Sequence, residues 1–358
     1  MISRIRVEEF LEMAGRCPVL DVRSPSEYAH AHIPGAISFP LFTDDERKQV
    51  GTTYKQVSRE NAIKIGLDYF GTRMRSMVET AERIAQDHYG TYTASEREKP
   101  AILVHCWRGG MRSAAIAWLL DLYGFRVYTL AGGYKAYRHW VLQQLAKPIP
   151  YRVIGGYTGS GKTDIIAHLQ KNGHQVLNLE EIAKHRGSAF GALGMGNQPS
   201  QEFFENQLAA NLYRFDHNKP VWTEDESRRI GNLNIPESLW NHIRRAPVYF
   251  ANVPMEERLS RIVAGYGKFR QDELAANIVR IKKRLGGVAT RDALGHLIEG
   301  NHRACFEILL RYYDKFYKHD IEVRRKETTV IEVETHTGDA AANARMLLGA
   351  SITEENKI

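Results

Sequence analysis

Short apolar runs alternate with helical segments along the first part of the chain. The runs at residues 17–23, 101–105 and 126–130 are bounded by glycine, proline or polar residues, which predicts buried strands. Residues 114–120 form an apolar stretch of helical character between the last two runs. Strands separated by helices favour a parallel sheet with crossover connections. We therefore predict an α/β domain in this part of the chain.

Two prolines, Pro148 and Pro150, interrupt this pattern, because proline cannot continue a helix and favours an extended connection. The alternation then restarts with predicted strands at residues 151–154, 175–179, 220–223 and 248–253 and a predicted helix at residues 163–170. Beyond about residue 255 the apolar positions recur at helical spacing. The sequence thus predicts two α/β domains, residues 1–146 and residues 151–350, the second with a mostly helical C-terminal part.

The composition agrees with two globular domains. The chain has 358 residues, 43% of them hydrophobic, so each domain can bury a core of its own. Its 3 cysteines are widely separated and match neither a disulfide framework nor a structural zinc site. No apolar run approaches the roughly 20 residues that span a bilayer. We therefore expect a cytoplasmic protein without a membrane partner, and the net charge of +7 favours polyanionic partners only slightly.

A cysteine lies at the end of one predicted strand. Cys106 follows the strand at residues 101–105, and the loop after it contains two glycines and the arginines Arg108 and Arg112. The backbone N–H groups of such a loop converge on the sulfur, and together with two guanidinium groups they lower the pKa of a thiol. Cys106 is therefore a candidate catalytic nucleophile, with Arg108 and Arg112 facing an anionic adduct. The alternative is an inert buried cysteine.

Residues 156–163 read G-Y-T-G-S-G-K-T, which fits the G-x4-G-K-S/T phosphate loop between a strand and a helix. Backbone N–H groups of such a loop cradle a diphosphate, and its lysine neutralises the charge. The candidate diphosphate-binding residues are Gly156, Thr158, Gly159, Ser160, Gly161, Lys162 and Thr163, with Thr163 also a candidate Mg²⁺ ligand. Glu224 and Asp225 are candidates for the second carboxylate that such sites need, unless they belong to a solvated acidic turn. The motif indicates a diphosphate but does not identify a nucleotide.

Two further segments carry weaker signals. Residues 184–200 are rich in glycine yet apolar, which suits either a lid over the diphosphate site or an ordinary surface loop. Between residues 255 and 327, 16 Lys plus Arg stand against 11 Asp plus Glu, and aromatic side chains are interleaved with the basic ones, a composition suited to RNA. The helical spacing of Tyr312 and Phe316 nevertheless predicts that these two rings pack in the core.

Segments on both sides of the cysteine loop help to distinguish between two reactions that such a loop supports. The loop itself has the H-C-x5-R-S form of tyrosine phosphatases. However, residues 20–28, 32–36 and 130–134 resemble the recurring segments of rhodanese-like sulfurtransferase domains, in the expected order. Compared with the common rhodanese loop, this loop is longer by one residue. A phosphate-bearing chalcogen donor is therefore among the expected substrates.

A rhodanese-like domain joined to a phosphate-loop domain resembles the bacterial tRNA 2-selenouridine synthase family. The segments at residues 185–191, 198–201, 226–231 and 312–317 fit the same resemblance. It implies a rhodanese-like, doubly wound parallel-sheet domain followed by a P-loop α/β domain with a helical C-terminal part.

The resemblance also implies a reaction. The sulfur of wobble 2-thiouridine in the anticodon region of tRNA is geranylated by geranyl diphosphate, and selenium from selenophosphate then replaces it. Cys106 would handle the selenium donor, Mg²⁺ would assist at the phosphate loop, and an enzyme that supplies selenophosphate is a further candidate partner. Three other functions fit the same residues: an ATP-dependent persulfide-relay tRNA sulfurtransferase, a phosphatase, and a non-catalytic nucleotide-gated RNA-binding module.

Overall fold

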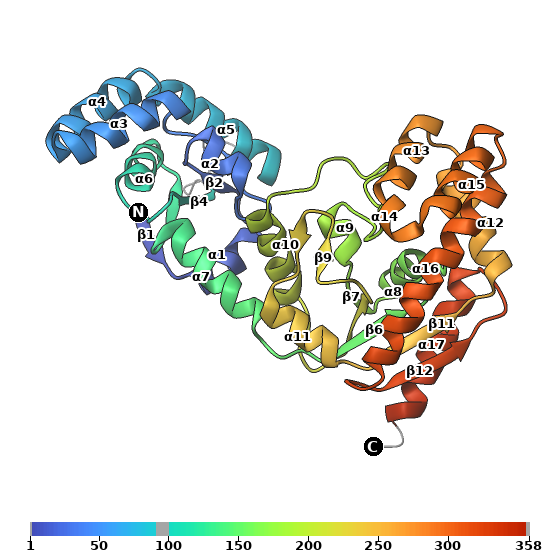
Figure 1. Ribbon diagram of the computed structural model, residues 1–358. Helices are drawn as coiled ribbons and strands as arrows, with labels where there is room; N and C mark the ends of the chain where they lie inside the picture. Colours follow the sequence, from blue (N-terminus) through green and yellow to red (C-terminus); the bar gives the residue numbers. More distant parts are fainter. Residues whose placement is uncertain (1, 91–99, 356–358) are drawn as a thin grey trace. The chain divides into compact units, whose positions relative to one another are not determined.

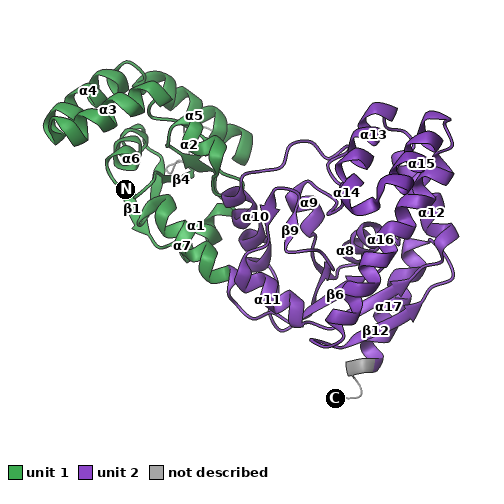
Figure 2. Ribbon diagram, viewed as in Figure 1, with its two compact units in different colours: residues 1–144 green, residues 145–358 purple. Residues whose placement is uncertain are grey.

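The computed structural model describes residues 2–90 and 100–355 and divides into two compact units, residues 1–144 and 145–358 (Figure 1, Figure 2). Each unit contains a five-stranded parallel sheet, so the predicted α/β fold class is confirmed. None of the described helices combines the length and apolar character that a membrane span requires.

The first unit is built on a sheet with the strand order β1-β5-β4-β2-β3. Its strands are β1 (Ile2–Ile5), β2 (Val19–Asp21), β3 (Ile37–Ser38), β4 (Ala101–His105) and β5 (Arg126–Leu130). Its helices are α1 (Val7–Ala14), α2 (Pro25–His30), α3 (Asp44–Gln56), α4 (Arg59–Gly71), α5 (Met74–Tyr89), α6 (Met111–Tyr123) and α7 (Gly133–Leu145). The central strand β4 is buried along its whole length, as its apolar sequence predicts, and it leads into the cysteine loop.

The second unit is built on a sheet with the strand order β12-β11-β6-β8-β7, and a two-stranded antiparallel hairpin stands apart from it. The sheet strands are β6 (Tyr151–Gly155), β7 (Gln175–Leu177), β8 (Val221–Glu224), β11 (Val248–Asn252) and β12 (Val330–Glu334), and the hairpin consists of β9 (Arg229–Ile230) and β10 (Leu233–Asn234). Beside the sheet lie α8 (Lys162–Lys171), α9 (Leu179–Ala183), α10 (Gln201–Tyr213), α11 (Glu237–Arg245) and α17 (Ala340–Glu355). Strand β8 pairs directly with β6, with Glu224 opposite Ile154, so the end of β8 lies beside the phosphate loop.

A group of helices follows β11: α12 (Met255–Tyr266), α13 (Gln271–Arg280), α14 (Lys282–Leu285), α15 (Gly287–Ile298) and α16 (His302–Arg324). They pack around a core of their own that includes Leu274, Leu297, Cys305 and Phe306. The chain then returns to the sheet as β12, which pairs with β11. The helical C-terminal part is confirmed, but the apolar pattern failed to predict β12 inside it, and it likewise failed to predict the edge strand β1.

Candidate active site

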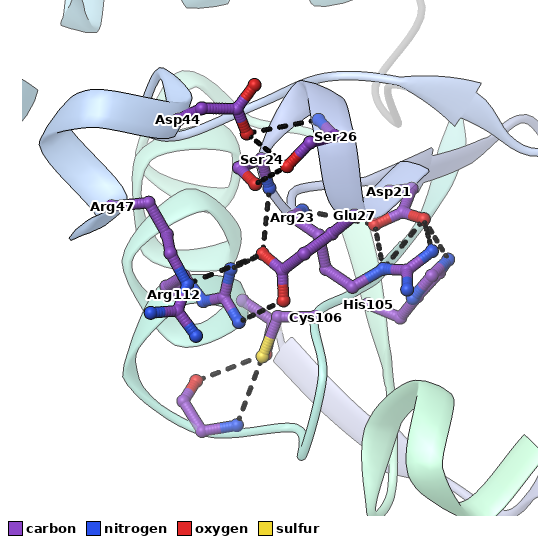
Figure 3. A network of polar contacts seen from close by, with 12 residues as sticks. Asp21, Arg23, Ser24, Ser26, Glu27, Asp44, Arg47, His105, Cys106 and Arg112 are labelled. Atoms are coloured by element: carbon purple, nitrogen blue, oxygen red, sulfur yellow. Dashed lines mark hydrogen bonds and ion pairs between the residues drawn. The ribbon is translucent and has the colours of Figure 1, made fainter. Parts of the chain in front are cut away.

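The cysteine loop joins β4 to α6 and wraps around a sulfur that is nearly buried. Cys106 is 3% exposed. Its Sγ accepts a hydrogen bond from the backbone N–H of Gly110 at 3.4 Å, and it lies 3.2 Å from the hydroxyl of Ser113 (Figure 3). The start of a helix and a converging turn therefore both face the sulfur.

These contacts change the acidity of the thiol. Burial by itself would raise the pKa of Cys106, but the hydrogen bonds from Ser113 and Gly110 and the charge of Arg112 outweigh it, so the pKa lies below its ordinary value. A thiol with a lowered pKa supplies more thiolate, which is the nucleophilic form. The geometry therefore supports the nucleophile prediction over that of an inert cysteine.

Arg112 is already paired in this loop. Its two terminal nitrogens donate to the carboxylate of Glu27 at 2.6 and 3.3 Å, and Arg47 adds a second cation at 3.8 Å (Figure 3). Glu27 is held in place because its Oε2 also accepts from the backbone N–H of Ser24 at the start of α2. Arg108, by contrast, is exposed on the loop. Of the two predicted arginines, the structure thus brings Arg112 to the sulfur, already paired with a carboxylate.

A buried polar network lies behind the loop. Arg23 is 1% exposed and pairs with Asp21 through Nη2 and Oδ2 at 2.6 Å, while its guanidinium covers the ring of Tyr134 at 3.9 Å. His105 lies 3.7 Å from the same carboxylate (Figure 3), and burial lowers its pKa to about 4, so the imidazole is neutral near pH 7. Gly133 has φ +61°, and a Cβ there would stand 2.4 Å from the carbonyl oxygen of Cys106. Close backbone packing therefore fixes the loop from behind.

The phosphate loop connects β6 to α8 and has the strained backbone that its glycines allow. Gly156, Gly159 and Gly161 all have positive φ, and a Cβ on Gly156 would stand 3.0 Å from the carbonyl oxygen of Ala251. The ammonium group of Lys162 donates to the carbonyl oxygen of Gly156 at 2.9 Å. It therefore lies over the hollow of the loop, where an anion would be bound.

The loop forms one side of a cavity of about 630 Å³, within the usual size range of ligand sites. Its basic lining side chains are Lys162, Arg186, Arg261 and Arg284. Its carboxylates are Asp164, Glu180, Asp225, Glu226 and Asp320. The aromatic lining comes mainly from α16.

The carboxylate that touches Thr163 comes from α9. Thr163 Oγ1 donates to Glu180 Oε2 at 2.7 Å. Glu224 is fully buried, and its Oε2 accepts from the backbone N–H of Leu179 at 3.0 Å. Asp225 lies 3.5 Å from Arg324 on α16. The predicted carboxylates thus lie at the end of β8, but Glu180 makes the direct contact.

Crowding of these acids raises their pKa values. Burial and the nearby charge of Glu180 raise the pKa of Glu224 to about 8. Burial and Glu180, which shares a hydrogen bond with it, raise the pKa of Glu226 well above its ordinary value. A cluster of acids that holds protons at neutral pH is stabilised when a cation enters, because the charges then compensate.

The donor set is suited to Mg²⁺. Hydroxyl and carboxylate oxygens are the ligands this ion prefers, and Glu224 Oε1 is a buried acceptor with no hydrogen-bond partner in the described part of the chain. Among the described residues, no group of three or more His, Cys, Asp or Glu side chains is arranged to hold a metal by itself. Mg²⁺ at phosphate loops is commonly completed by phosphate oxygens and water, so Thr163 remains its predicted protein ligand.

Helix α16 forms the aromatic wall of the cavity. Tyr312, Tyr313, Phe316 and Tyr317 all line it, and Phe316 is 48% exposed. The prediction that the Phe316 ring packs in the core is therefore wrong, because one turn of helical periodicity cannot distinguish a core from a cavity wall.

The same helix is tied to the phosphate loop. Arg258 of α12 pairs with Asp314 at 2.7 Å and donates to the carbonyl oxygen of Thr158 at 3.1 Å. Lys162 lies 5.2 Å from the ring centre of Tyr317, close enough for a cation–π interaction. The helical part of the unit thus supports the diphosphate site directly.

The glycine-rich segment at residues 184–200 forms another wall of the cavity. The backbone N–H of Arg186 donates to the carbonyl oxygen of Gly191 at 3.0 Å across a tight turn, and Phe190 within this turn is buried. Residues 186–189 line the cavity. The segment therefore contacts the site, as the lid hypothesis requires, and whether it opens stays a prediction.

Family models match both units. A rhodanese-like domain matches residues 6–139, which include the cysteine loop, and the model described as the tRNA 2-selenouridine synthase AAA domain matches residues 149–345. The chain belongs to the tRNA 2-selenouridine synthase family, a family of transferases.

Curated members of that family are similar along most of the chain. The protein from Shewanella denitrificans is 32% identical over 88% of this chain and 90% of its own length, and that from Hahella chejuensis is 33% identical over 94% and 92%. The protein from Nitrosomonas europaea is 38% identical over 70% of this chain and 63% of its own length. All three are named tRNA 2-selenouridine synthase.

Three residues that contact the two loops were not among those predicted from the sequence: Ser113, Glu27 and Glu180. Ser113 was visible as the last residue of the H-C-x5-R-S pattern, and Glu27 lies inside a rhodanese-like segment. Glu180 had no local signal, because it reaches Thr163 from a short helix after a different strand. A search for acids after each predicted strand would have found it.

Proposed function

We propose that the chain replaces the sulfur of wobble 2-thiouridine in tRNA by selenium, through an S-geranylated intermediate. In the first step the sulfur attacks C1 of geranyl diphosphate, the C1–O bond breaks, diphosphate leaves with the electron pair, and the base loses its N3 proton. In the second step the selenium of selenophosphate adds at C2 of the base, the C–S bond breaks, and the sulfur leaves with the electron pair and takes up a proton as geranylthiol. Water then cleaves the Se–P bond, so that phosphate is released, selenium stays on C2 and the N3 proton is restored.

The phosphate loop is suited to the first step. Its N–H groups and Lys162 stabilise the negative charge that develops on a departing diphosphate, and this stabilisation lowers the barrier because the charge grows in the transition state. Bound Mg²⁺, held from the protein side by Thr163, would supply further positive charge there. Thr163 and the acids around Glu180 orient the mouth of the loop.

The cysteine loop is suited to the selenium donor. The thiolate of Cys106 stands among the N–H of Gly110, the hydroxyl of Ser113 and the guanidinium of Arg112. These groups attract and orient an anionic phosphate-bearing donor at the sulfur. One combination of features carries the proposal. A chain of the selenouridine synthase family has a cysteine whose pKa lies below its ordinary value, and it also has a phosphate-loop motif that lines a cavity large enough for an organic diphosphate ester.

The tRNA and the cellular setting complete the proposal. The basic, aromatic helices between residues 255 and 327 offer charge for tRNA phosphates and rings for an unstacked base. The reaction takes place in the cytosol, where tRNA is available and an enzyme that makes selenophosphate can supply the donor.

Mass spectrometry of tRNA nucleosides tests the proposal. Cells carrying Cys106→Ala are expected to lose 2-selenouridine while S-geranyl-2-thiouridine still forms, because the phosphate loop is intact. Cells carrying Lys162→Ala are expected to lose geranylation and therefore selenation. Cys305→Ala and Lys171→Ala serve as matched controls, since Cys305 is buried in the helical core and Lys171 is exposed at the end of α8. Normal 2-selenouridine in both test variants would contradict the proposal.

A reconstituted reaction separates it from the sulfurtransferase alternative. The purified chain is mixed either with thiouridine tRNA, geranyl diphosphate and selenophosphate or with tRNA that has an unmodified wobble uridine, ATP and a sulfur donor. Selenation only in the first mixture supports the proposal, and turnover only in the second favours an ATP-dependent persulfide relay.

A further inference from the structure

A second, smaller chamber opens beside the diphosphate site. It has a volume of about 30 Å³ and nine lining residues, five of which also line the large cavity. The shared residues include Thr158 of the phosphate loop, Ile262 and Tyr266 of α12 and Tyr313 of α16. The chamber is therefore an extension of the diphosphate site itself.

The far end of this chamber is entirely hydrocarbon. The four lining residues that it does not share are Phe190, Phe306, Leu309 and Leu310, all of them buried. None of these side chains carries a hydrogen-bonding group. The site therefore changes within a short span from a cradle for phosphate to a wholly apolar end.

This change of polarity selects the organic part of the ligand. A nucleoside pointing into the chamber would bury polar ring and sugar atoms without hydrogen-bond partners, and each unpaired group would destabilise the complex. A hydrocarbon chain would instead be stabilised in proportion to the apolar surface that it buries. A chamber of about 30 Å³ accepts only the tip of such a chain, while the 630 Å³ cavity holds the diphosphate and the rest.

We propose that this chamber receives the tip of the hydrocarbon chain of the diphosphate substrate, and that Leu309 and Phe306 at its end determine the chain length accepted. The inference rests on the proposed function, since it concerns the same diphosphate site. The hydrocarbon extends from Lys162 past Ile262 and Tyr266 into the chamber, and chains longer than the chamber allows are excluded because the buried end wall cannot recede.

Chain-length competition tests this inference. The purified full chain is given thiouridine tRNA and an equimolar mixture of dimethylallyl, geranyl and farnesyl diphosphates, and the alkylated nucleosides are quantified by mass spectrometry. Leu309→Ala enlarges the chamber and is expected to raise the farnesyl-to-geranyl ratio about 10-fold, since even one methylene in a pocket is worth a factor of about 10 or more. Leu309→Phe fills the chamber and is expected to raise the dimethylallyl-to-geranyl ratio by a similar factor.

Leu297→Ala provides the matched control. Leu297 belongs to the same helical core as Leu309 and is equally buried, but it does not line the chamber. It should lose comparable thermal stability without a change in product ratios.

The outcomes separate the inference from the function on which it rests. Suppose that the wild type transfers geranyl, but the product ratios are unchanged in both Leu309 variants or change equally in Leu297→Ala. The chamber then does not set the chain length, and the proposed function stands. If the wild type transfers none of the three hydrocarbon chains, both the proposed geranylation step and the proposed role of the chamber are wrong.

Discussion

The cysteine loop and the phosphate loop share one strand–loop–helix arrangement. Each follows a central parallel strand, turns with at least one glycine at positive φ, and leads into a helix whose first N–H groups are suited to an anion. The two loops differ in the side chains that face their backbone N–H groups. In the cysteine loop the sulfur is buried and Arg112 is neutralised by Glu27, whereas the phosphate loop opens onto a 630 Å³ cavity with crowded acids. On the proposed function, the backbone of both loops binds an anion, and the facing side chains decide whether the loop serves a nucleophile or a leaving group.

The largest effect should come from breaking the support behind the cysteine loop. Asp21→Asn leaves the guanidinium of Arg23 buried without its counter-charge, which typically costs about 3–5 kcal/mol of unfolding free energy. Asp44→Asn, a change of an exposed carboxylate in the same unit, should lower the free energy of unfolding far less. Denaturant unfolding of both variants measures the difference. Equal losses would show that the buried pair does not stabilise this unit.

The next effect concerns the acids of the phosphate loop and depends on pH. The pKa of Glu224 is about 8 in the folded chain against an ordinary 4.5, so the native state retains a proton that the unfolded state releases between these values. The unfolding free energy should therefore fall as pH rises from about 4.5 to about 8. Glu224→Gln should remove this fall and stabilise the chain at pH 8 by up to about 4 kcal/mol.

Thermal unfolding at pH 5 and pH 8 measures this effect. Glu299→Gln is the control, because Glu299 is an exposed acid with 70% of its side chain accessible. A variant with the same pH dependence as the wild type would show that Glu224 ionises normally.

A smaller effect is expected at the thiol itself. Ser113→Ala removes a hydrogen bond to the sulfur that favours the thiolate, so it should raise the pKa of Cys106 toward its ordinary value. The pH profile of iodoacetamide alkylation, read by peptide mass spectrometry, reports this pKa, with Cys17 and Cys305 as internal references. Ser113→Thr, which keeps a hydroxyl, should restore part of the shift. An unchanged pH profile in Ser113→Ala would show that the Ser113 hydroxyl does not lower the pKa of Cys106.

The smallest effect tests the pairing of Arg112. Glu27→Gln frees the charge of Arg112 from its counter-ion and should lower the pKa of Cys106 further, by less than Ser113→Ala raises it. The same alkylation profile measures it, and a rise in pKa would mean that Glu27 is needed to hold Arg112 near the sulfur. The two variants at this loop should thus shift the profile in opposite directions.

Local sequence was sufficient for the two loops but not for their surroundings. Each loop lies in a strand–loop–helix segment whose apolar run, glycines and charged residues are contiguous, so Cys106 and Lys162 could be assigned directly. Strands β1 and β12 were missed because each is short and only partly buried, and each pairs in parallel with a strand remote in sequence. Glu180 and Glu27 reach the loops from helices remote in sequence, so the spacing within either loop motif does not predict them.

The α/β fold class, the cysteine loop, the phosphate-loop motif and the similarity to the family all follow from the amino-acid sequence. All of these depend on residues that are neighbours along the chain, where hydrogen bonding and steric limits act over a few positions. The folded structure was needed to find that Glu180 rather than Glu224 touches Thr163, that Phe316 lines a cavity, and that an apolar chamber adjoins the phosphate loop. These features depend on how helices and strands distant in sequence pack together, because burial and close approach are properties of the folded chain.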